Sequence, residues 1–99
     1  SWGSKRFPIA LADGVSKIHT IGIAREEGGV VPMVFVQTSA EIKDAASRQK
    51  LAESVRDEFL KNNAGIADAF AHITVRMTNE DVAKATAQVK YESVVVPTK

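Results

Sequence analysis

The clearest pattern in the chain is a helical stripe in its middle. Between residues 38 and 63, apolar and small residues recur every three or four positions, and charged residues occupy most positions between them. This spacing is typical of an amphipathic helix with one buried side. Thr38 and Glu41 have the spacing of a capping box, so we expect the helix to begin at Thr38. Asn63 and Gly65 tolerate left-handed backbone and predict its end.

Three extended segments precede this helix. They are expected to be strands and run from Phe7 to Ala12, from Val15 to Arg25 and from Val30 to Gln37. Asp13 and Gly14, between the first two segments, form a strong signal for a two-residue hairpin turn. A tight turn there predicts that Ile9 lies opposite Ile18.

Two further segments, after the helix, alternate between apolar and polar residues. The first covers residues 67–77 and the second residues 83–92, and together they predict a hairpin in which Met77 lies opposite Ala83. A helix over residues 80–88 remains the alternative to the second strand. The predicted order is three strands, a long helix and two strands. We therefore expect an α+β fold, in which one face of a mostly antiparallel sheet of about five strands carries the helix.

The strands before the helix are apolar on both faces, which one covering helix does not explain. Strict alternation places Ile9, Ile18 and Phe35 on one face. The opposite face then carries Val15, Ile21, Ile23, Val30, Val34 and Val36. Monomers rarely expose an apolar patch of this size, so the second set is expected to form an interface, most simply in a two-fold homodimer. In the alternative, the chain covers this face itself with its terminal arm and residues 94–96.

Basic residues gather on the outer side of the second predicted hairpin and on the first long strand. The candidate face for an anion or a nucleic acid consists of Lys17, His19, His72, Arg76, Lys84 and Lys90. Basic residues around an aromatic ring suit the phosphates and bases of a single strand. A merely solvated face and a protein contact are the alternatives, because several carboxylates lie nearby in the sequence.

Composition narrows these possibilities further. The 99 residues are expected to form a single domain over residues 1–99, with residues 1–6 as a flexible arm. The absence of cysteine excludes disulfides, thiolate metal sites and cysteine nucleophiles. The two histidines lack ligand spacing, so we expect no metal site and no cofactor. No apolar run approaches the roughly 20 residues of a membrane-spanning helix, so no membrane insertion is expected.

The sequence contains no motif that indicates catalysis. We therefore expect a non-catalytic interaction or assembly module that acts as a symmetric homo-oligomer through its sheet. A nucleic-acid-binding dimer of the packaging or coat type is the first alternative. The second alternative is a small-ligand-binding domain or enzyme with a pocket between helix and sheet, lined by Tyr91 or His72.

Overall fold

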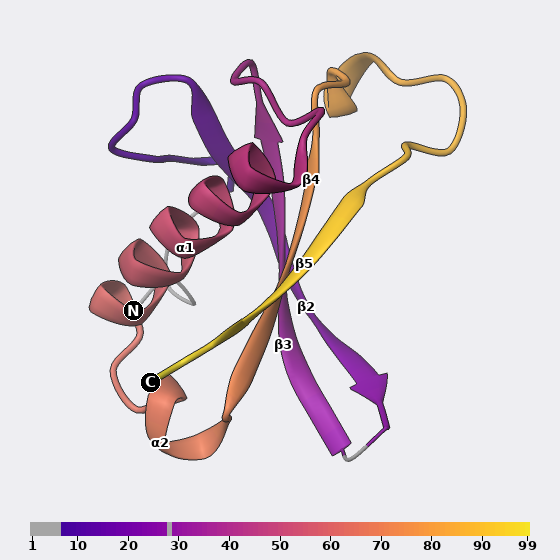
Figure 1. Cartoon of the computed structure of the whole chain (residues 1–99). Helices are drawn as coiled ribbons and strands as arrows, with labels where there is room; N and C mark the ends of the chain where they lie inside the picture. Colours follow the sequence, from indigo (N-terminus) through magenta and orange to yellow (C-terminus); the bar gives the residue numbers. More distant parts are fainter. Residues whose placement is uncertain (1–6, 28) are drawn as a thin grey trace.

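A mixed sheet and one long helix form the body of the molecule (Figure 1). The computed structural model describes residues 7–27 and 29–99, so the predicted arm at residues 1–6 lies outside the described residues. Over the described ranges, five strands follow one another across the sheet in the order β1-β2-β3-β4-β5. The strands are β1 (Ile9–Ala10), β2 (Ser16–Glu26), β3 (Gly29–Thr38), β4 (His72–Thr78) and β5 (Glu92–Pro97). Only β3 and β4 pair in parallel. The expected α+β architecture is confirmed.

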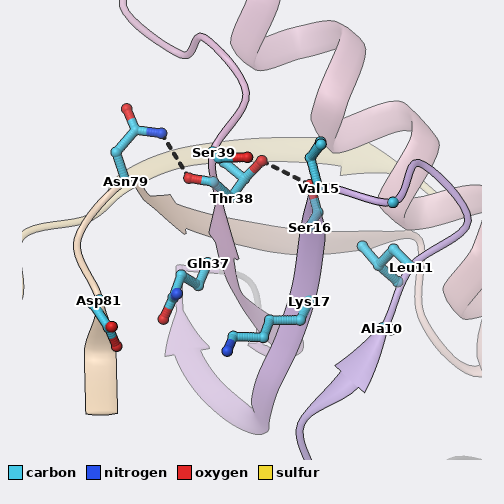
Figure 2. A pocket seen from close by; sticks show the side chains of 11 residues that line it. Ala10, Leu11, Val15, Ser16, Lys17, Gln37, Thr38, Ser39, Asn79 and Asp81 are labelled. Atoms are coloured by element: carbon cyan, nitrogen blue, oxygen red, sulfur yellow. Dashed lines mark hydrogen bonds between the residues drawn. The ribbon is translucent and has the colours of Figure 1, made fainter. Parts of the chain in front are cut away.

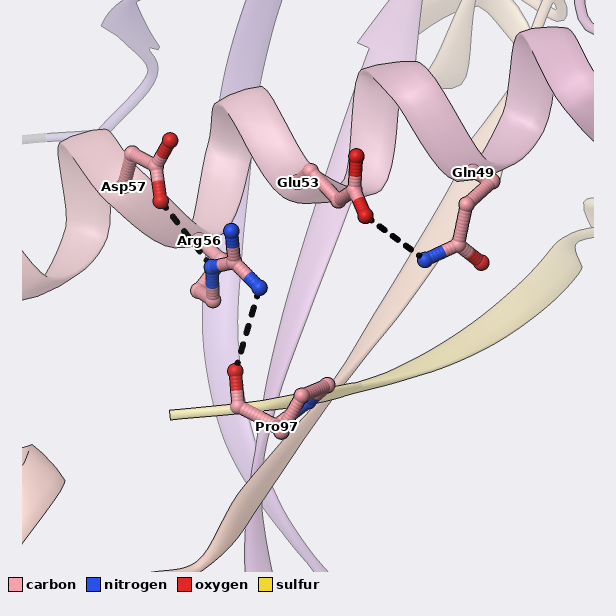
Figure 3. A network of polar contacts seen from close by, with 5 residues as sticks. All are labelled: Gln49, Glu53, Arg56, Asp57 and Pro97. Carbon is pink, nitrogen blue, oxygen red and sulfur yellow. Dashed lines mark hydrogen bonds and ion pairs between the residues drawn. The ribbon is translucent and has the colours of Figure 1, made fainter. Parts of the chain in front are cut away.

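Helix α1 (Ala45–Asn62) connects β3 to β4. Two neighbouring parallel strands need a crossover of about a dozen residues or more, and α1 supplies it. The helix packs on β4 and β5, where Arg56 Nη1 donates a hydrogen bond to the carbonyl of Pro97 at 3.3 Å (Figure 3). Arg56 Nε also contacts Asp57 at 2.9 Å. The helix therefore covers the half of the sheet that is formed later in the chain.

The start of α1 differs from the prediction. Asp44 is its N-cap, with Oδ2 accepting from the backbone N–H of Ser47 at 2.9 Å. Thr38 is instead the last residue of β3, and its hydroxyl lies 2.7 Å from that of Ser16. The prediction of a start at Thr38 is thus wrong, because the strand end already uses this side chain. The end of the helix is confirmed at Asn63, its C-cap.

The first hairpin has the predicted register, with Ile9 opposite Ile18. Its turn depends on Asp13, whose Oδ1 accepts from the backbone N–H groups of Val15 and Ser16 at 2.9 and 2.8 Å. Gly14 has a φ of 74°, which glycine adopts without the steric cost that a side chain would add.

The second predicted hairpin is wrong in its pairing. Met77 lies opposite Glu92, and Ile73 lies opposite Val96, so the last strand begins later than expected. A short helix α2 (Ile66–Ala69) precedes β4. Residues 79–91, here called the strap, contain only the 3-10 turn η2 (Val82–Lys84). Consecutive valines favour a strand more than the alanine-rich strap does, and this explains the shift.

A β-bulge in β2 changes which residues share a face. The register against β3 shifts between Ile18 and Thr20, so Ile18 and Ile21 point to the same side of the sheet. Strict alternation had separated them. The core beneath α1 contains Ile18, Val34, Val36, Ala52, Val55, Phe59, Ile73, Val75, Met77 and Val96. Val34 and Val36 are fully buried, and their predicted place on an uncovered face is therefore wrong.

Candidate interaction surface

Three residues of the predicted interface lie together at one end of the sheet. Ile21, Ile23 and Val30 lie on the helix side of β2 and β3, near the tip of the hairpin that these strands form. At this end the hairpin diverges from β4 and β5 (Figure 1). Ile23 is 75% exposed and Val30 is 40% exposed. Val15 is also exposed, but it precedes β2 at the other end of the strand.

An apolar groove of about 440 Å³ runs past Ile23. The hairpin supplies one wall, and the end of α1 and the α2 region supply the other. The lining residues are Phe7, Ile21, Gly22, Ile23, Pro32, Phe59, Asn63, Ile66 and Phe70. We call the apolar side chains of this region the hairpin patch, defined as Phe7, Ile21, Ile23, Val30 and Phe70. Phe7, Ile23 and Val30 are exposed, whereas Ile21 and Phe70 are half-buried. Sequence reasoning missed the aromatic members, because only the fold brings Phe7 and Phe70 to the hairpin.

The hairpin patch borders a strand edge that is unpaired within residues 7–27 and 29–99. β1 pairs with β2 only at Ala10–Lys17 and Ile9–Ile18. From Thr20 to Glu26, no strand in the described part of the chain lies on that side of β2. Such an edge presents unpaired backbone N–H and C=O groups, which favour pairing with a further strand.

The opposite side of the sheet, which we call the open face, carries part of the predicted basic set. His19, the extra residue of the bulge, lies on this face together with Lys17, and Tyr91 from the strap contacts it there. The Tyr91 hydroxyl and His19 Nε2 are 3.0 Å apart. The Phe35 ring packs edge-on against Tyr91 at 5.3 Å between centroids, and Arg76 lies over both rings at 5.9 and 5.8 Å. The sequence did not single out Phe35 for this cluster.

Burial shifts the acid–base behaviour of the two polar rings. Burial, aided by the positive charge of Lys17, lowers the pKa of His19. Burial also raises the pKa of the Tyr91 hydroxyl, although the charge of Arg76 opposes that shift. Both shifts favour the neutral side chains, so the contact between His19 and Tyr91 is one between uncharged groups near neutral pH.

The structure divides the predicted basic face. Lys17, His19 and Arg76 lie on the open face. His72 is on the same face but at the far end of β4, and Lys84 and Lys90 belong to the strap. The guanidinium of Arg76 is held by Ser93 Oγ at 3.1 Å and by Met33 Sδ at 3.8 Å. The rings of His19, Phe35 and Tyr91 pack against one another, so their faces are only partly open to solvent. This arrangement anchors the strap more than it offers free ring faces to bases.

Within residues 7–27 and 29–99, no group of three His, Cys, Asp or Glu side chains is placed to hold a metal ion. None of the helices described there is both long and apolar enough to cross a membrane. Comparison of the chain with family models, with curated proteins and with solved structures finds no match.

Proposed function

We propose that the protein is a non-catalytic interaction module that assembles with a second copy of itself through the hairpin patch and the outer edge of β2 from Thr20 to Glu26. The observation that carries this proposal is Ile23, a large apolar side chain that is 75% exposed at the centre of that edge. Isolated exposed apolar residues are ordinary, but Ile23 borders both an apolar groove and a strand edge with which no described strand pairs.

A second copy suits this surface because the edge is self-complementary. Antiparallel pairing of two β2 edges about a two-fold axis at Ile23 sets Ile21 opposite Arg25 of the second copy. The same register sets Gly22 opposite Ala24, and no like charges face each other. At about 3.4 Å per residue, the edge from Thr20 to Glu26 is roughly 24 Å long, comparable to ordinary strand pairs in globular proteins. The two hairpin patches then lie on the same face of one continuous sheet.

The test is the oligomeric state, measured by sedimentation equilibrium over the micromolar range. We expect a dimer for the native chain and a monomer for Ile23→Lys, because the substitution places a charge at the centre of the apolar contact. Val95→Lys is the matched control, since Val95 is 53% exposed in a strand on the open face. A native chain that stays monomeric at high micromolar concentration contradicts the proposal, and so does a dimer broken by Val95→Lys and not by Ile23→Lys.

Nucleic-acid binding through the open face is the second candidate. It is favoured by Lys17, His19 and Arg76 on one face, with Lys84 and Lys90 in the adjoining strap. It is disfavoured by the occupied ring faces of the cluster. This candidate predicts binding to a single-stranded oligonucleotide that weakens steeply with salt, and no binding at about 50 mM salt contradicts it.

A further inference from the structure

A pocket of about 480 Å³, with both polar and apolar side chains in its walls, lies at the end of the sheet where β3 and β4 finish. Figure 2 shows that its side chains come from the turn between β1 and β2, from the end of β3 and from the start of the strap. Its polar lining includes Ser16, Lys17, Gln37, Thr38, Asn79 and Asp81. This is a different place from the pocket beneath the helix that the sequence suggested for a ligand, and neither Tyr91 nor His72 lines it.

The topology explains why a pocket forms here. β3 and β4 are parallel neighbours, so their carboxyl ends lie together. After Thr38 the chain turns toward α1 on the helix side. After Thr78 it turns to the open face, where the N–H of Val82 bonds to Gln37 Oε1 at 2.9 Å. Parallel strands whose following connections leave toward opposite faces open a crevice at their carboxyl ends, and such crevices are the common ligand sites of α/β sheets.

The walls of this pocket are fixed by hydrogen bonds that the protein makes with itself. Asn79 Nδ2 donates to the carbonyls of Thr38 and Ala40 at 2.8 and 2.9 Å. The hydroxyls of Ser16 and Thr38 contact each other at 2.7 Å. These groups join β2, β3 and the start of the strap, so the pocket is preformed.

Two donors of the pocket are left over. Within the described part of the chain, the Lys17 ammonium has no hydrogen-bond or ion-pair partner, and neither has the Nε2 group of Gln37. The bond from Val82 to Gln37 Oε1 orients this amide and leaves its N–H groups to donate elsewhere. Asp81 Oδ1 accepts from the N–H of Ala83 at 3.1 Å, and its second oxygen is uncommitted among the described residues. In the view of Figure 2, Gln37 lies between Lys17 and Asp81.

We propose that this pocket binds a small organic carboxylate that also carries a hydroxyl or ammonium group. Lys17 and Gln37 donate to the two carboxylate oxygens, and Asp81 accepts from the hydroxyl or ammonium. Hydrogen bonds between charged groups are stronger than neutral ones, so Lys17 and Asp81 supply most of the affinity and Gln37 the orientation. The site is independent of self-assembly, because Lys17 and Ile23 lie toward opposite ends of β2.

The experiment is a titration of the full chain with L-serine, L-lactate and inorganic phosphate, followed by amide chemical shifts in two-dimensional NMR. We expect saturable shifts at Lys17, Gln37, Ser39 and Val82 with serine or lactate. Asp81→Asn keeps the acceptor for Ala83, and it should weaken serine more than lactate because it removes the charge that faces the ammonium.

Gln37→Glu is the sharpest variant, because its carboxylate still accepts from Val82 while repelling the ligand carboxylate. We expect Gln37→Glu and Lys17→Ala each to weaken binding at least about tenfold. Lys50→Ala, on the exposed side of α1, is the matched control and should leave binding unchanged. The proposal is overturned if neither serine nor lactate produces saturable shifts. Shifts with phosphate alone, or shifts that persist in Gln37→Glu and Lys17→Ala, overturn it as well.

Discussion

Two regions on one face of the sheet have the same kind of side chains and opposite environments. Ile18 and Ile23 both belong to β2 and both point toward the helix side, yet Ile18 is fully buried and Ile23 is 75% exposed. The same contrast recurs in β3, where Val34 is fully buried and Val30 is 40% exposed. Residue type and the face of the sheet therefore do not decide burial on their own here.

The difference arises from the unequal lengths of the strands. β2 and β3 have 11 and 10 residues, whereas β4 and β5 have 7 and 6. β4 pairs with β3 only from Met33 to Gln37, and α1 rests on β4 and β5. The hairpin end thus extends past both its neighbouring strand and its covering helix. An alternating pattern indicates the side to which a residue points, and the length of the adjoining elements determines whether anything covers it.

The largest expected effect comes from substituting the two isoleucines by the same residue. Ile18→Ala should lower the free energy of unfolding by about 2–5 kcal/mol, because it removes buried methyl groups and leaves a cavity in the core. Ile23→Ala should change it by about 0.5 kcal/mol or less in dilute protein, since its side chain meets mostly solvent there. Urea unfolding followed by circular dichroism measures both values.

The dependence of the unfolding midpoint on protein concentration separates these two substitutions further. If the native chain assembles through Ile23, its unfolding midpoint rises with concentration, because the second copy binds only the folded state. Ile23→Ala should remove this dependence, whereas Ile18→Ala should keep it. Equal losses of stability for the two variants in dilute protein would contradict the contrast between the two regions.

The strap and the helix α1 cover opposite faces of the sheet, and they are held in different ways. The helix contributes buried Ala52, Val55 and Phe59. The strap is held instead by hydrogen bonds of Asn79, of Val82 with Gln37 and of Tyr91 with His19. Tyr91→Phe removes the hydroxyl that meets His19 and should cost about 1 kcal/mol or less, as one partly exposed hydrogen bond does.

Tyr91→Ala removes the ring contacts with Phe35 and Arg76 as well, so its effect should be larger but local. We expect faster amide hydrogen exchange at Val82 and Lys90 in the strap, with exchange in α1 unchanged. Faster exchange across α1 would contradict a strap that is held separately from the core.

The parts of the fold that the sequence predicted correctly are those that depend on signals between residues close together in the chain. The order of elements, the register of Ile9 with Ile18 and the helix end at Asn63 follow from turn chemistry and periodicity. The helix start was wrong because the spacing of Thr38 and Glu41 also fits a cap, while the carboxylate that caps the helix belongs to Asp44. Residue preferences alone do not decide between Thr38 and Asp44 as the N-cap of the helix.

The remaining errors concern pairing between distant segments. The bulge after Ile18 has no signal in an alternating pattern, and it reversed the predicted face of every residue on one side of it. Ile21, Ile23 and Val30 were chosen as interface residues for their apolar character, and that assignment stays a prediction. Val34 was misplaced because its burial depends on the crossover of α1. The pocket at the carboxyl ends of β3 and β4 escaped prediction for a similar reason, since only the parallel pairing of these strands brings Asp81 near Lys17 and Gln37.

The smallest expected effect is a dependence of strap stability on pH. Burial and the charge of Lys17 lower the pKa of His19 in the folded protein, so the unfolded chain binds a proton at this residue more readily than the folded one. The stability that this difference contributes is present above the ordinary histidine pKa of 6.5. It is lost as the pH falls from there through the lowered folded value.

Exchange at the strap amides, measured from pH 8 to pH 5 and corrected for intrinsic rates, tests this sign. We expect a loss of protection at Val82 and Lys90 on acidification, smaller than the loss caused by Tyr91→Ala. His19→Gln keeps a polar group near the Tyr91 hydroxyl and removes the titration, so its protection should be nearly constant over this range. His72→Gln is the matched control, because His72 is exposed at the far end of β4 and should leave the native pH dependence in place. Protection that rises on acidification would mean that the imidazolium is the form that the folded cluster prefers, and that His19 holds Tyr91 through its charge.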